Sequence, residues 1–196
     1  MVMTDDEVRT FIRKNEWATG LRVGSDGRSL YYENPESNCM ELRFPEKPMQ
    51  VPFFTRVASS LNLDREELFY GAVLWLTLWD IGSPQLEKTG WRTIEKMRLG
   101  FGENRPIAMA PGHSFRSDEF VDLNAFLIPC FVFGWDAWLI PAGNDYFVHI
   151  SHDEFWVVVT RTTEIHEALH RQLSDLSPRL PHEETLGRFC CKTKGA

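Results

Sequence analysis

The sequence predicts a single α+β domain in which helices flank an antiparallel sheet of about five or six strands. Two patterns support this fold class. Three runs of strand-forming residues follow one another over 135–141, 145–151 and 155–160, with the short polar turns Ala-Gly-Asn and His-Asp-Glu between them. Apolar residues then recur at helical spacing after Thr162. A C-terminal three-stranded meander covered by a helix is the expected result.

The chain length suits one hydrophobic core. A chain of 196 residues buries roughly 70% of the surface that it exposes when unfolded. Its hydrophobic (43%) and charged (25%) fractions are ordinary for a globular protein. We expect one domain over 1–181, because Pro178 and Pro181 end the last helix, and a poorly ordered tail over 182–196.

The N-terminal quarter predicts a helix followed by a β-hairpin. Thr4 and Glu7 have the spacing of a capping box, and apolar residues continue at helical spacing to Asn15. Beyond a glycine-containing break, the short runs 29–33 and 40–44 have strand composition. We expect these two runs to pair with each other.

The middle of the chain alternates helical and extended patterns. The expected elements are a helix over 52–61, a helix beginning at Asp64 and a short helix over 91–99. The apolar run 72–79 suits a buried strand or a helix, and its aromatic and β-branched residues favour the strand. A loop then leads to His113. Ser117 caps a further helix that Pro129 is expected to end. The residues of that helix expected to face inward are Phe120, Val121, Leu123 and Phe126.

Charge and composition argue against several classes of function. The formal net charge of -7, spread along the chain, repels nucleic acids and anionic lipids. The longest apolar stretches, 71–79 and 125–135, fall short of the roughly 20 residues that span a bilayer. The acidic first residues do not resemble a signal peptide, and the four cysteines lack C-x-x-C spacing. We expect a cytoplasmic protein that binds neither nucleic acid nor membrane.

The last predicted helix contains the sequence His166-Glu167-Ala168-Leu169-His170. It resembles the zinc-metalloprotease (zincin) signature H-E-x-x-H, in which two histidines on one helix face bind Zn²⁺ and the glutamate acts as general base. The resemblance implies His166 and His170 as ligands and Glu167 as base towards a zinc-bound water.

The surroundings of this motif depart from the zincin pattern. Arg171 and Gln172 follow it, Leu173 replaces the metzincin glycine, and Leu176 stands where the third ligand is expected. The available substitutes are His182, Glu183 and Glu184. The same helix has an apolar stripe typical of an element packed on a sheet. We therefore expect a packed scaffold helix that does not bind catalytic zinc.

Gly112-His113-Ser114-Phe115-Arg116 partly resembles the nucleophile elbow G-x-S-x-G of α/β-hydrolases, although Arg116 replaces the last glycine. An antiparallel meander supplies no alternating β-α units to carry the other two members of a triad. A capped loop before the Ser117 helix is the preferred interpretation.

Asp136 lies between two tryptophans at the start of the meander, so a buried carboxylate there needs a partner. One hypothesis is a cleft in which Asp136, His113 and His149 converge as acid and base. The other is a structural ion pair. His149 and His152 point to opposite faces of an extended strand, so they share a site only if the strand has already turned.

The function predicted first is that of an acidic binding protein acting on a protein partner. The segments F-G-W-D-A and S-H-D-E within 133–154 resemble small bacterial proteins, some of them immunity proteins, and the 13% aromatic content suits an interface. The alternatives are a zinc-dependent hydrolase using His166 and His170, and a small-molecule pocket between sheet and helices.

Overall fold

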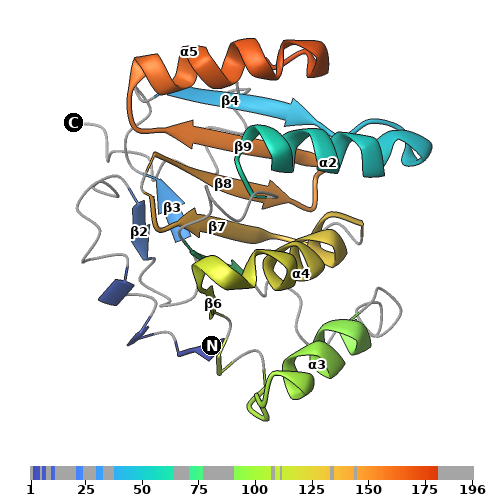
Figure 1. Ribbon diagram of the computed structural model, residues 1–196, viewed down its shortest axis with the longest axis vertical. Coiled ribbons are helices and arrows are strands. Elements are labelled where there is room, and N and C mark those ends of the chain that lie inside the picture. Colours follow the sequence, from blue (N-terminus) through green and yellow to red (C-terminus); the bar gives the residue numbers. More distant parts are fainter. Residues whose placement is uncertain are drawn as a thin grey trace, which may run out of the picture.

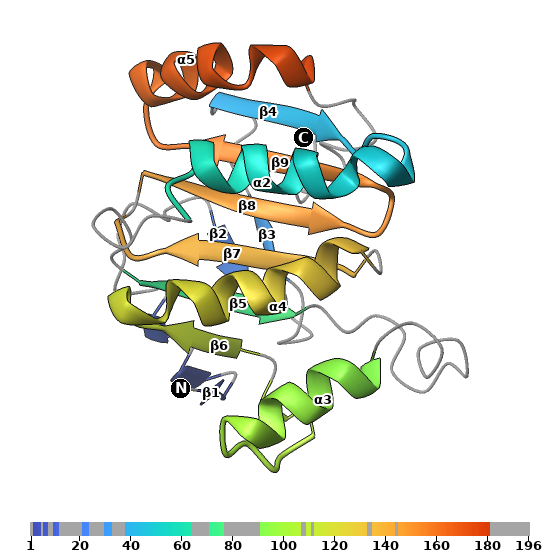
Figure 2. The ribbon, with the colours of Figure 1, turned by 45° about the vertical axis from the view of Figure 1, so that its right-hand side comes forward.

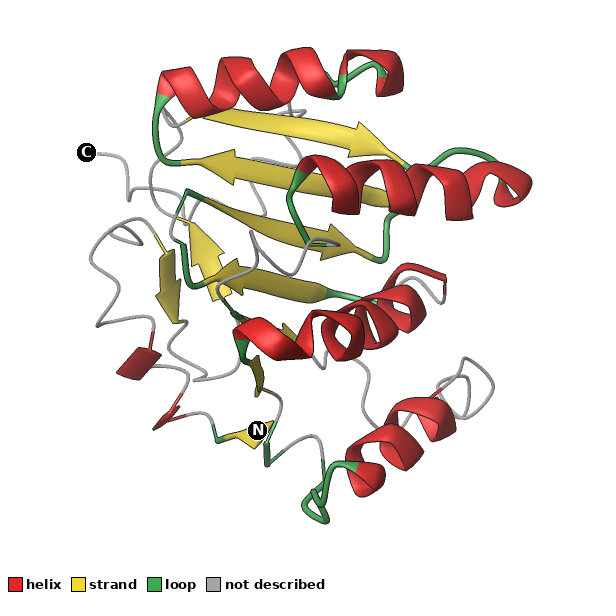
Figure 3. Cartoon of the chain, in the orientation of Figure 1, coloured by secondary structure: helices red, strands yellow, loops and turns green. Residues whose placement is uncertain are grey.

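A computed structural model gives the fold (Figure 1). It describes residues 2–4, 6–7, 10–11, 21–23, 30–32, 38–63, 71–76, 91–106, 109–110, 112–132, 135–143 and 145–180. Within these ranges an antiparallel sheet carries helices on one face, as Figure 3 shows, which confirms the α+β class. The expected helix from Asp64 and the tail over 182–196 lie outside the described residues.

The sheet has the spatial order β1-β6-β5-β7-β8-β9-β4, and every neighbouring pair is antiparallel. The two-residue β1 adds to six longer strands. Their bounds are β1 (Val2–Met3), β4 (Asn38–Arg43), β5 (Ala72–Leu76), β6 (Gly112–Phe115), β7 (Ala137–Pro141), β8 (Tyr146–Ser151) and β9 (Phe155–Thr160). The predicted meander is confirmed, because β7, β8 and β9 are consecutive neighbours.

The N-terminal hairpin has different strands from those predicted. β3 (Leu30–Tyr32) pairs with β2 (Leu21–Val23) in a separate two-stranded sheet, whereas β4 pairs with β9 along its whole length. Four consecutive residues in the middle of β4 are buried. A strand buried on both faces fits a covered sheet better than a surface hairpin.

The predicted strand over 72–79 is confirmed over 72–76 by β5, and residues 77–79 lie outside the described ranges; its neighbour β6 was expected to be a loop. β6 lies between β5 and β1, with His113 opposite Leu74. Gly71 lets the chain enter β5 beside β6: its φ is 107°, and an added Cβ would lie 2.7 Å from the Phe115 carbonyl oxygen. Only glycine combines this φ with so close a backbone approach.

The helices agree with the predicted positions except at one end. They are α2 (Gln50–Ser60), α3 (Trp91–Gly100), α4 (Phe120–Val132) and α5 (Thr163–Gln172), with the 3₁₀ turns η2 (Lys47–Met49), η4 (Ser117–Glu119) and η5 (Ser174–Leu176). Thr162 caps α5, accepting a hydrogen bond from the Ile165 backbone. The reciprocal Thr4–Glu7 capping bonds also form. The expectation that Pro129 ends α4 is wrong, because the helix continues to Val132.

Aromatic packing joins the helical layer to the sheet. Figure 2 shows α2 and α4 lying side by side across one face. Phe131 of α4 lies 5.9 Å from Trp156 of β9 and 5.8 Å from both Phe53 and Phe54 of α2, measured between ring centroids. Trp156 is fully buried at this junction. The ring cluster therefore fixes α4 relative to both α2 and the sheet.

The opposite face of the sheet is also buried. A second cluster of apolar side chains forms there, with Phe11 from the N-terminal segment packed on it. Figure 2 places β2 and β3 behind the sheet, on the side away from α2 and α4. This two-sided burial explains why the meander strands read as nearly continuous apolar runs.

A fully buried carboxylate holds the sheet edge at β4. Oε1 of Glu41 accepts hydrogen bonds from Nε of Arg43 (2.6 Å) and from the guanidinium of Arg179 (2.7 and 3.0 Å). The backbones of Glu41 and Arg179 also exchange two hydrogen bonds. The segment after α5 is thereby fastened to the edge strand and covers part of it.

Replacement of Phe131 by alanine should destabilise the fold by about 3 to 5 kcal/mol, because the ring is lost from a packed core. The neighbouring exposed Val132→Ala change should cost less than about 0.5 kcal/mol. Chemical denaturation of both variants checks this. Equal, small losses would show that Phe131 does not join the layers.

Candidate functional site

Two histidines converge on one buried carboxylate at the turn between β8 and β9. Oδ1 of Asp136 accepts a hydrogen bond from the His152 backbone nitrogen (2.9 Å), and Oδ2 accepts one from His152 Nδ1 (2.8 Å). Nε2 of His149 lies 3.9 Å from Oδ1. The chain turns directly after Ser151, which removes the alternation that would otherwise separate the two imidazoles.

Burial keeps His149 uncharged. Burial, with repulsion from His152, lowers the pKa of His149 to about 3 despite the nearby Asp136 carboxylate. Its ring centroid lies 4.6 Å from that of Trp138. At neutral pH His149 is therefore a neutral polar group, packed on an indole beside the Asp136 carboxylate.

His152 has the orientation of a general base held by a carboxylate, with Nδ1 bonded to Asp136. The atom that would exchange a proton with a substrate is Nε2, and it lies 3.5 Å from Oδ1 of Asp153. Two carboxylates thus flank the ring. The arrangement locks the β8–β9 turn, and the hydrogen bond from Asp153 N to Ser151 Oγ (3.2 Å) completes it.

His113 does not belong to this cluster. It lies on β6 opposite Leu74, whose side chain belongs to the helix-covered core, and its ring lies 4.8 Å from Phe126 of α4. His149 lies opposite Trp138, which is part of the core on the other face. The structure therefore brings Asp136 and His149 together and separates His113 from them by the sheet.

The segment that resembles a nucleophile elbow is an extended strand. Ser114 lies within β6 opposite Val73 of β5. An elbow needs its serine on a sharp strand-to-helix turn. The backbone at Ser114 has instead the geometry of an ordinary antiparallel strand.

The two histidines of the zincin-like motif lie on α5 with ring centroids 6.0 Å apart. Burial and repulsion from His170 lower the pKa of His166, while Glu167 is exposed and lies 3.9 Å from Arg171. In the part of the chain that the structure describes, no three His, Cys, Asp or Glu residues are grouped to hold a metal ion. His182, Glu183 and Glu184 lie outside that part, so the expectation that α5 does not bind catalytic zinc stays a prediction.

The sequence did not reveal that α4 is apolar on its solvent side as well. Val121, expected to face inward, is 63% exposed, and Ile128 (45%) and Val132 (47%) are exposed along the same side of the helix. Positions seven and four residues apart share a helix face. The inner side carries the buried Leu123, Phe126, Leu127, Cys130 and Phe131.

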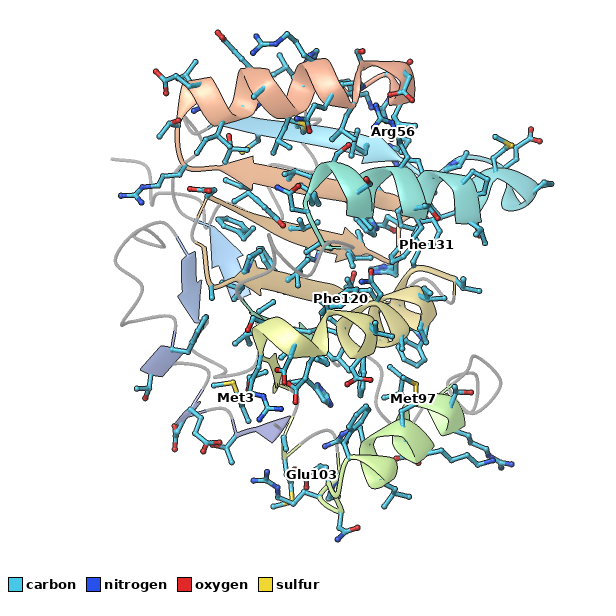
Figure 4. The ribbon with its side chains drawn as sticks, viewed as in Figure 1. Met3, Arg56, Met97, Glu103, Phe120 and Phe131 are labelled. Carbon is cyan, nitrogen blue, oxygen red and sulfur yellow. The ribbon has the colours of Figure 1, made fainter. Side chains whose placement is uncertain are left out.

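Exposed apolar residues also lie on both flanks of α4. Met49 ends η2 and Val51 lies in the first turn of α2, the helix whose Phe54 contacts Phe131 of α4; Figure 4 shows Phe131 between the two helices. Leu99 and Phe101 lie at the end of α3, and the Phe101 ring is 5.6 Å from Phe126. We call Val121, Ile128, Val132, Met49, Val51, Leu99 and Phe101 the α4 surface.

This surface gathers most of the exposed apolar side chains. Seven of the nine large hydrophobic residues exposed in the described ranges belong to it. By contrast, α5 exposes the charged residues Glu164, Glu167 and Arg171 and buries only one side chain fully. α5 is therefore an ordinary amphipathic surface helix, whereas α4 is apolar on two sides.

The charged groups at the start of α4 are mainly acidic. Residues 117–132 contain Asp118, Glu119 and Asp122 and no basic residue. The guanidinium of Arg116 lies 3.2 Å from a carboxylate oxygen of Asp118 and 3.2 Å from one of Glu119. All three side chains reach solvent, so these two ion pairs are weak. The rim of the α4 surface is negative at this end.

No protein-family model, no curated protein and no solved structure matches this chain. None of the helices in the described ranges is both long and apolar enough to cross a membrane.

Asp136→Asn should destabilise the fold by about 1 to 3 kcal/mol, because the amide cannot accept both hydrogen bonds from His152. The matched change Asp153→Asn, in the turn, should cost less than about 0.5 kcal/mol. Midpoints of denaturant unfolding compare the two. Equal effects near zero would show that Asp136 does not hold the turn.

His149 should make the fold less stable as pH falls. Its pKa is about 3 in the folded protein, against an ordinary value of 6.5 when the chain is unfolded, so between these values only the unfolded state binds the proton. This group then lowers the free energy of unfolding by about 1 kcal/mol for each pH unit below pH 6.5.

The His149→Gln variant should lose this contribution, while His170→Gln on the exposed side of α5 should keep it. Denaturation at several pH values between 6.5 and 4 measures the slopes. Parallel curves for His149→Gln and the wild type would contradict the burial of a neutral His149.

Proposed function

We propose that the protein is a binding protein whose α4 surface docks a basic amphipathic helix from a protein partner. The observation that carries the proposal is the exposure of Val121, Ile128 and Val132 on a helix whose other side is fully packed. Single exposed apolar residues are normal on any protein. A group of them on one helix and its two flanks is typical of an interaction surface.

The spacing of the exposed residues suits a helical partner. Val121, Ile128 and Val132 form a stripe along α4, and further exposed apolar residues lie at the start of α2 and the end of α3, where Phe54 and Phe101 contact rings of α4. A partner helix reads such a surface through apolar anchors at positions i, i+3, i+4 and i+7. Packing of this kind buries the apolar atoms that solvent now contacts.

Charge selects a basic partner over a second copy of this chain. The protein carries a net charge of -7, which opposes association between copies and attracts a basic surface. The acidic start of α4 places part of that charge at the rim of the surface. Binding should therefore weaken as the salt concentration rises.

A cytoplasmic location is part of the same proposal. Cys130 is fully buried and is a thiol. Buried, reduced cysteines suit a compartment in which disulfides do not persist.

An Ile128→Glu variant should lose the partner, because a charge would be buried against apolar anchors. The partner is captured on immobilised wild-type protein, purified and titrated calorimetrically against each variant. Affinity for Ile128→Glu should fall at least about tenfold. Glu167→Gln on α5 is the matched control and should bind as the wild type does.

Two results would contradict the proposal. Equal affinity of Ile128→Glu and the wild type would exclude the α4 surface, and a loss confined to Glu167→Gln would assign binding to α5. Unfolding midpoints of both variants establish that the altered side chains leave the fold intact.

A further inference from the structure

A pocket opens at the acidic end of the α4 surface. It has a volume of about 290 Å³ including the space open to solvent. Because part of that volume is open solvent, the pocket has room for the end of one side chain and does not enclose a drug-sized molecule.

The walls of this pocket are aromatic. The ring of Phe126 is central: its centroid lies 5.6 Å from that of Phe101, 5.5 Å from that of Phe115 and 4.8 Å from that of His113. Phe115 and Phe126 are buried, whereas Phe101 is 52% exposed. Phe101 therefore forms an outer wall that a bound group would cover.

Two carboxylates, Glu119 and Asp122, complete the lining. Oε2 of Glu119 accepts a hydrogen bond from the Arg116 backbone nitrogen (2.8 Å), which fixes that side chain at the start of the helix. Asp122 lies one turn further along α4 and is partly exposed. The pocket thus combines aromatic side chains with negative charge.

We propose that this pocket binds the ammonium or guanidinium group of a lysine or arginine side chain carried by the partner helix, an inference that rests on the proposed function. Aromatic faces attract cations, and the attraction adds to that of nearby carboxylates. The methylene stem of the same side chain would pack along Phe101. The bound lysine or arginine would set the register of the partner helix, so that the apolar anchors of that helix meet Val121 and Ile128.

Competing ligand classes fit the lining less well. An anion would face Glu119 and Asp122, and an uncharged apolar group would remove water from both carboxylates without contributing a charge of opposite sign. No three metal-binding side chains are grouped among the described residues, and this holds for His113 with the two acids. The positive end of the α4 dipole opposes a cation, but the three acids of 117–122 outweigh its half charge.

The test uses three small probes with the full chain: N-acetyl-lysine methylamide, its arginine equivalent and its norleucine equivalent. Norleucine keeps the carbon stem and lacks the charge. NMR titrations follow the resonances of Phe101, Phe115 and Asp122. At least one cationic probe should bind, and the norleucine probe should bind at least about tenfold more weakly.

Variants of the pocket sharpen the result. Asp122→Asn and Phe101→Ala should each weaken the cationic probe about threefold to tenfold and should also weaken the purified partner. Glu167→Gln should change neither affinity. Equal binding of the norleucine probe, absence of binding by both cationic probes, or an unchanged affinity in Asp122→Asn would overturn the proposal.

The two proposals fail separately. Ile128→Glu should leave probe binding unchanged, because Ile128 does not line the pocket. If no cationic probe binds while Ile128→Glu still abolishes partner binding, the pocket is excluded and docking on α4 stands. If the probes bind as expected while Ile128→Glu and Asp122→Asn both retain full partner affinity, docking on α4 and the role of the pocket in it are both excluded.

Discussion

The contact between Phe131 and Trp156 is the interaction on which the helical layer depends. Trp156 is buried in β9, and Phe131 contacts it while also touching both phenylalanines of α2. Nearer the start of α4, the side-chain amide of Asn124 donates a hydrogen bond to the carbonyl oxygen of Leu63, three residues after the end of α2 (2.7 Å). With α4 fixed at both ends, its remaining apolar side chains have no place in the core and must face solvent or a partner.

The buried polar groups stabilise the fold and leave binding to the helices. Glu41 fastens the segment after α5 to the sheet edge, and Asp136 fixes the β8–β9 turn through His152. Each of these carboxylates is paired at short range, as the cost of burying charge requires. The exposed apolar side chains lie on α4, and a partner that covers them would gain the free energy of burying them.

Local sequence patterns predicted elements far better than they predicted pairing. The meander follows from runs of strand-forming residues separated by polar turns, α5 follows from apolar residues at helical spacing, and both predictions are correct. The partner of β4 is β9, more than a hundred residues away, and no local pattern encodes such a pairing. β6 was missed because four residues including a glycine give no strand signal.

α4 continues past Pro129 because burial of Cys130 and Phe131 beyond it offsets the lost hydrogen bond. The outward direction of Val132 was therefore invisible while the helix was expected to stop at Pro129. The sequence marks the turn after Ser151, but the meeting of His149 and His152 on Asp136 depends on how the side chains are oriented at that turn, which no local pattern predicts.

Docking on α4 can be measured by site-specific photo-crosslinking in cells from position 128, with position 167 on α5 as the reference. We expect a cross-link from position 128 to a basic helix of one protein partner, and none from position 167. A cross-link from position 167 with none from position 128 would contradict it.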